Sequence, residues 1–139
     1  MHKIIVDART GAQTTSPLIQ SEIDAMQPSL AMLKTAKHTQ IERERDAACY
    51  ANITVNGHAW QADPRSQSLM ATAILLAQAG VYTPSVWRTA DNVDVPVTIQ
   101  ALVLIAGSIA AQTQVAYAAS WARKAALEAA TTAAEVAAV

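Results

Sequence analysis

The chain has 139 residues, which is enough for one domain with a real core or for a small domain with an arm. Its formal net charge of −1 argues against nucleic-acid binding, because that function normally shows as a basic stripe. The single cysteine, Cys49, cannot form an internal disulfide, and the N-terminus Met1–Lys3 lacks the long apolar run of a secretory signal. We therefore expect synthesis in a reducing cytoplasm.

Residues 1–28 are predicted to form an N-terminal strand-and-turn arm. Ile4–Val6 is the expected strand, and Thr10–Pro17 is the best linker candidate. Ser16 and Ser21 offer helix starts, but Pro28 allows only a short helix after them.

Residues 29–51 are predicted to form a charged helix that starts at Ser29. Its alternating charges over Ile41–Asp46 are interpreted as solvated surface. Glu42 and Glu44 could act as a carboxylate pair, yet the arginines between and beside them favour surface ion pairs. Cys49 falls at the end of this helix, where a buried small residue is the commoner outcome than a nucleophile.

Residues 52–139 are predicted to form the main domain, which opens with a β-hairpin. The turn Asn56-Gly57 supplies the two positive-φ positions of a type I′ turn. A two-residue turn pairs Ile53 with Trp60 and Val55 with His58, so Ile53, Val55 and Trp60 share one apolar face. We therefore expect this hairpin to pack on a helix.

A capped helix is predicted directly after the first hairpin. Asp63 is its expected N-cap, and Pro64 suits the first position because it has no amide hydrogen to leave unpaired. The helix is expected to stop near Gly80.

The second predicted hairpin joins Val86–Thr89 to Val93–Val97 through a turn around Asp91-Asn92. Its register is ambiguous because no glycine fixes the turn, and Pro96 implies an edge strand. Thr98 then caps a long Ala-rich helix to about Ala130, which would be roughly 50 Å long.

This long helix must protrude or pack on another chain, because a domain of this size has a radius of gyration of only about 14 Å. An approximate seven-residue repeat suits self-association. We expect a contact surface made by Ile99, Leu102, Ile109 and Trp121, with Trp121 as an exposed anchor, whereas Ile53, Trp60 and Trp87 form the core. The repeat comprises Ile99, Leu102, Ala106, Ile109, Thr113 and Ala116.

Three segments of the main domain carry a family resemblance: Trp60–Asp63, Ser66-Gln67 and Trp87–Asn92. With the strand and turn Ile4–Gly11, they resemble a small domain found at the C-terminus of bacteriophage tail-fibre assembly and tail-associated proteins. The resemblance covers roughly Arg43 to Val139.

This resemblance implies a non-catalytic protein that binds a phage tail fibre or a neighbouring tail component. The chain would be an assembly factor that shields the fibre during trimerisation, in the host cytoplasm, or a subunit retained in the virion tail. We expect a homo-oligomer with no cofactor, no nucleic-acid partner and no membrane partner. The expected fold is α+β and helix-rich, with two short β-hairpins packed on helices.

No catalytic or metal-binding pattern stands out. The three histidines, His2, His38 and His58, have no second ligand at metal spacing. The four glycines are too scattered for a phosphate loop. Asp63 and Asp91 have structural roles as cap and turn residue. We therefore predict no enzyme activity.

A membrane-active phage protein is the alternative from another class. No charged residue occurs between Asp94 and Arg123, so Val95–Ala122 is long enough to span a bilayer. Against this, the run contains several polar residues, and past Ile109 it is apolar mainly through alanine, which inserts weakly. A buried bundle helix explains the same residues more simply.

Overall fold

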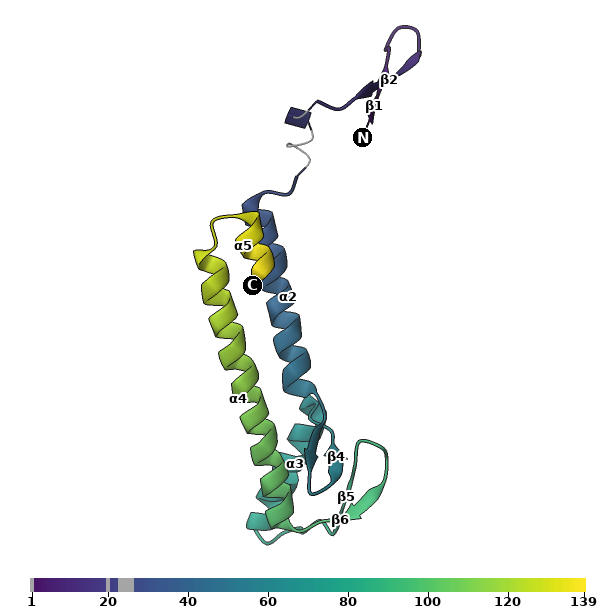
Figure 1. Cartoon of the computed structure of the whole chain (residues 1–139). Coiled ribbons are helices and arrows are strands. Elements are labelled where there is room, and N and C mark those ends of the chain that lie inside the picture. Colours follow the sequence, from purple (N-terminus) through teal and green to yellow (C-terminus); the bar gives the residue numbers. More distant parts are fainter. Residues whose placement is uncertain (1, 20, 23–26) are drawn as a thin grey trace.

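The computed structural model describes residues 2–19, 21–22 and 27–139, and its main feature is a long antiparallel helix pair (Figure 1). Helix α2 (Leu30–Tyr50) runs beside α4 (Ile99–Ala129), and the short α5 (Ala133–Ala138) lies next to α2 near one end of the pair. Helix α3 (Pro64–Gln78) and two β-hairpins gather at the other end, which we call the lobe (residues 53–97). The predicted helix-rich α+β class is confirmed.

The N-terminal arm is a hairpin that lies beyond the α5 end of the helix pair (Figure 1). Strand β1 (His2–Val6) pairs antiparallel with β2 (Gln13–Pro17), with His2 opposite Pro17. The linker prediction is therefore wrong for Gln13–Pro17, because these residues satisfy their backbone groups by pairing with β1. Residues 23–26, on which the predicted short helix mainly falls, lie outside the described residues.

Local capping chemistry sets where the helices start, as predicted. The Ser29 side chain accepts a hydrogen bond from the Met32 amide at the start of α2, and Thr98 accepts from Ala101 at the start of α4. At α3, the Asp63 carboxylate accepts from the amides of Arg65 and Ser66.

The first lobe hairpin has the predicted register. Strand β3 (Ile53–Val55) pairs with β4 (His58–Trp60), with Ile53 opposite Trp60 and Val55 opposite His58. Asn56 and Gly57 have φ values of 53° and 77°, as a type I′ turn requires. The indole Nε1 of Trp60 donates to the Val55 carbonyl at 3.0 Å, so the buried ring keeps its polar group satisfied.

The second hairpin has one definite register, which the sequence left open. Strand β5 (Val86–Arg88) pairs with β6 (Asp94–Pro96), with Trp87 opposite Val95. The buried Thr89 hydroxyl fixes the loop, because it accepts from the Val93 amide at 3.0 Å and lies within hydrogen-bond distance of the Asp91 carboxylate. The Ala90 amide donates to the Ala59 carbonyl at 2.8 Å and so ties the two hairpins together.

Two hydrophobic cores lie along α4, one in the lobe and one near α5. The lobe core contains the three residues predicted for it, with Ile53 and Trp60 buried and Trp87 half-buried against them. Its other buried members are Ala62, Met70, Ala73, Leu102, Ile105 and Ile109. The second core joins Ile41, Leu127, Ala130 and Val136.

Truncation of Trp60 should destabilise the lobe strongly. Trp60→Ala removes a large buried side chain, so we expect a loss of ~3 kcal/mol or more in the free energy of unfolding. Chemical denaturation followed by circular dichroism measures this loss. His58→Ala is the control, because the imidazole is exposed and meets the Trp60 ring in a T-shaped arrangement, and it should be nearly silent. An unchanged midpoint for Trp60→Ala would show that the hairpin is not docked.

Candidate interaction surface on helix α4

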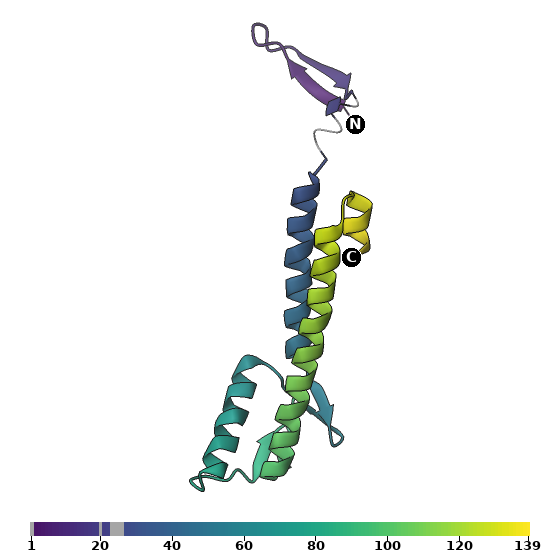
Figure 2. The same ribbon diagram turned by 90° about the vertical axis from the view of Figure 1, so that its left-hand side faces the viewer.

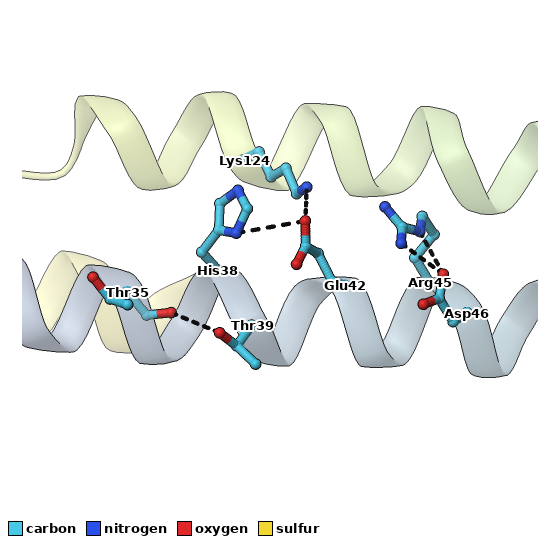
Figure 3. A network of polar contacts seen from close by, with 7 residues as sticks. All are labelled: Thr35, His38, Thr39, Glu42, Arg45, Asp46 and Lys124. Atoms are coloured by element: carbon cyan, nitrogen blue, oxygen red, sulfur yellow. Dashed lines mark hydrogen bonds and ion pairs between the residues drawn. The ribbon is translucent and has the colours of Figure 1, made fainter.

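Ion pairs between α2 and α4 involve charged residues that the sequence analysis assigned to the solvated surface, and Figure 3 shows the pair of Glu42 with Lys124. Lys124 Nζ donates to Glu42 Oε1 at 2.8 Å, and the Arg123 guanidinium pairs with the Glu44 carboxylate. The predicted pairing of these glutamates with neighbouring arginines of their own helix is therefore wrong. Both carboxylates instead reach across to α4, while Arg45 pairs with Asp46.

Two further contacts fix α2 and α4 lengthwise. Lys34 Nζ donates to the Glu128 carbonyl at 2.8 Å, and Gln112 Nε2 donates to the Ala51 carbonyl at 2.8 Å. These contacts lie near opposite ends of α2. Both lie on the side of α4 that faces α2.

The pKa values of both interhelical glutamates are lowered. The hydrogen bond from Lys124 is the main cause of the lowered pKa of Glu42, and the bond from Arg123, followed by that from Gln40, lowers the pKa of Glu44. The ionised carboxylates therefore contribute to holding the helices together.

An aromatic pair lies on the free surface of α4, next to these ion pairs. Trp121 is 63% exposed and meets Tyr117 edge to face, with ring centroids 5.8 Å apart. Arg45 Cζ lies 4.9 Å from the Tyr117 ring centroid, which is a cation–π distance. Arg45 of α2 contacts the Tyr117 ring of this pair, whereas the Trp121 indole points outward into solvent.

Aliphatic side chains extend this exposed surface toward the lobe. Leu104 is 51% exposed and Val115 is 71% exposed, and Val103 is exposed as well. Figure 2 looks onto α4 from this side, and none of the described elements lies in front of it. We call this uncharged exposed side the free face of α4.

The structure divides the four predicted contact residues. Leu102 and Ile109 are 0% and 2% exposed, because they point into the lobe core, and Ile99 is half-buried against the same core. The expectation that they lie on a contact surface is wrong: the seven-residue repeat faces the chain's own elements. Trp121 lies on the free face. Val103, Leu104 and Val115 were missed, although each lies on the side of the helix away from the repeat.

The candidate catalytic groups stay apart or buried. Cys49 is buried in α2, and His38 approaches Glu42 at 3.7 Å. Among the described residues, no three His, Cys, Asp or Glu side chains are placed to hold a metal ion. Asp63 and Asp91 cap α3 and bond within the β5–β6 loop, as predicted.

A family model described as a domain of unknown function (DUF4376) matches residues 32–139. The chain belongs to this family. The matched region includes the lobe, α4, α5 and nearly all of α2, whereas the β1–β2 hairpin lies outside it. No curated protein and no solved structure gave a match.

Helix α4 is long and apolar enough to cross a membrane, by length and composition alone. Only 22% of the apolar window is buried within the chain, because the helix pair covers one side of it. The exposed apolar surface of the free face would suit contact with either a protein or a lipid bilayer.

Acid should weaken the helix pair through Glu42 and Glu44. Because their pKa values in the folded chain lie below the ordinary 4.5, the ion pairs stabilise the fold above that pH and lose this effect as pH falls through the lowered values. The effect should be small, since both side chains are partly exposed and screened. Thermal melts of the native chain and of Glu42→Gln/Glu44→Gln between pH 7 and pH 3 measure it. The double variant should show the shallower pH dependence; identical slopes would contradict this account.

Proposed function

We propose that this protein is a non-catalytic phage tail protein that binds a tail fibre or a neighbouring tail component. The free face of α4 carries the proposal, because a charge-free helix side with an exposed indole favours a protein contact. The resemblance of the lobe segments to tail-fibre assembly and tail-associated proteins supplies the identity of the partner.

The segments behind the resemblance have structural tasks in the lobe. Trp60 is in the core, Asp63 caps α3, and Asn92 has the positive φ of the second turn. The resemblance therefore supports a shared lobe fold, and the binding surface is proposed from α4.

Two roles fit this proposal. As an assembly factor, the chain would shield apolar fibre surface during trimerisation and then leave; as a virion subunit, it would stay. Self-association of the chain is compatible with either role, because both a chaperone and a tail component act on a fibre of several subunits.

A membrane-active role is the second candidate, and the apolar length of α4 favours it. Insertion of α4 would remove Leu102, Ile105 and Ile109 from the lobe core. It would also break the interhelical pairs of Arg123 and Lys124 with α2. These losses make the protein-binding role the better proposal.

Mass spectrometry of purified virions separates the two tail roles. A retained subunit should be found in virions at a constant ratio to the fibre. An assembly factor should be absent from virions but should co-purify with co-expressed fibre from cell extracts. Absence from both samples would contradict the proposed function.

The full chain should be soluble without detergent, because the glutamines and serines of α4 and its packed inner side oppose insertion. Fractionation of expressing cells tests this, with a known membrane protein as the reference. Recovery of the chain only in the membrane pellet would favour the membrane-active role instead.

A further inference from the structure

The free face of α4 contains a second seven-residue repeat, distinct from the buried one. Seven residues make nearly two helical turns, so residues seven apart share a face. Two interleaved series run along the outward side with alternating spacings of four and three. One series is Leu104, Ala111, Ala118 and Ala125, and the other is Ser108, Val115, Ala122 and Ala129.

This outward stripe consists of small or aliphatic residues throughout. All its members are exposed except the half-buried Ser108. The Ser108 hydroxyl donates to the Leu104 carbonyl at 2.9 Å, so it needs no outside partner. A solvent-facing side of a helix normally carries charged residues, so this stripe is built like a helix-packing seam.

Gly107 is a separate observation that points to close approach from outside. Glycine is the poorest helix former apart from proline, and Gly107 lies inside α4. A Cβ added there would meet nothing within 4 Å, so the chain's own packing does not require glycine. A neighbour that comes close to the backbone beside the stripe would require it.

We propose that this stripe packs against the same stripe of a second copy, with the two α4 helices antiparallel. Residue size decides the direction. Leu104 lies at one end and the other end is alanine only, so antiparallel pairing sets large residues against small ones and keeps the helices evenly spaced. Parallel pairing would set Leu104 against Leu104 and splay the helices. No charged residue lies between Ile99 and Ala122 to oppose the contact, and beyond Ala122 the charges of Arg123 and Lys124 are paired with α2.

Each series pairs with the same series of the second copy in this arrangement. Leu104 of one copy meets Ala125 of the other, Ala111 meets Ala118, and Val115 meets its own counterpart at the twofold axis. An antiparallel twofold also keeps like flanks together, so Trp121 of one copy lies beside Gly107 of the other. In this arrangement the absence of a side chain at Gly107 of one copy makes room for the Trp121 indole of the other.

The area suffices for a specific contact. From Leu104 to Ala129 the stripe is about 38 Å long at ~1.5 Å per residue, and a helix width of roughly 10 Å gives about 380 Å² per copy. The partly exposed Trp121 of each copy adds on the order of 100 Å². The total is about 1,000 Å², near the lower bound for a specific interface.

Light scattering on the purified full chain tests this inference. We expect the native protein to have twice the chain mass of 14.7 kDa, and Ala118→Glu to have the single mass. Ala47→Glu is the matched control: it makes the same substitution at an exposed alanine of α2, and it should leave the dimer intact. Circular dichroism of each monomeric variant checks that it is folded.

Gly107→Leu distinguishes a second copy from a lipid surface. The leucine should raise the dimer dissociation constant at least tenfold, because it fills the space for Trp121. On a lipid-facing helix the same change would strengthen binding, so the native chain and Gly107→Leu are also floated with neutral phosphatidylcholine vesicles. Flotation of the native chain that increases in Gly107→Leu would overturn the inference.

Cross-linking tests the direction, in a Cys49→Ala background with a short bis-maleimide. Leu104→Cys mixed with Ala125→Cys should give a cross-linked dimer, whereas each variant alone should give little. A monomeric native chain, an Ala118→Glu variant that behaves like Ala47→Glu, or cross-linking of Leu104→Cys alone would overturn the inference.

The inference rests on the part of the proposed function in which α4 binds a protein, and it names that protein as a second copy. Its test uses no fibre or virion. A native monomer that co-purifies with fibre would overturn the dimer and leave the tail role standing. A native dimer that is absent from virions and does not co-purify with fibre would support the dimer and contradict the tail role.

Discussion

The packing of one side of α4 holds the lobe and the helix pair together. Leu102, Ile105 and Ile109 of α4 enter the lobe core, and further along the same helix Leu127 packs with Ile41 of α2. A single rigid helix therefore belongs to both cores. Because burial of apolar side chains is the main favourable term in folding, loss of this side of α4 would separate the lobe from the helix pair.

Polar contacts give the helix pair its register where apolar shape cannot. Between the two cores, Ala48 and Ala116 line a hollow between α2 and α4, and such small side chains specify little about how the helices align. The bonds from Lys124 to Glu42 and from Gln112 to Ala51 lie on either side of this stretch. They fix how far one helix is shifted along the other, and with it the position of the lobe relative to α5.

A two-helix pair leaves about half of each helix uncovered. On α2 the uncovered side is charged or polar at positions such as Arg43 and Gln40, which suits water. On α4 it is aliphatic and alanine-rich, and it carries Trp121. This difference between two helices in one pair is why the proposed protein contact is assigned to α4.

Local patterns in the sequence determined most of the elements. Asn56-Gly57 set the first turn, and Ser29, Asp63 and Thr98 set three helix starts, because these effects act within a few residues. The register of the second hairpin was not determined locally. It depends on the buried Thr89 hydroxyl and on the bond from Ala90 to the first hairpin.

Only the tertiary structure decided which side of α4 is free. The sequence shows a seven-residue repeat at Leu102 and Ile109, but a repeat looks the same whether its partner is the same chain or another. Folding brings α2 and the lobe onto that repeat and leaves the opposite side exposed, from Leu104 to Trp121. Likewise, Glu42 and Glu44 are charged by sequence, but their partners on α4 lie about 80 residues away, and only the chain's path in space brings them together.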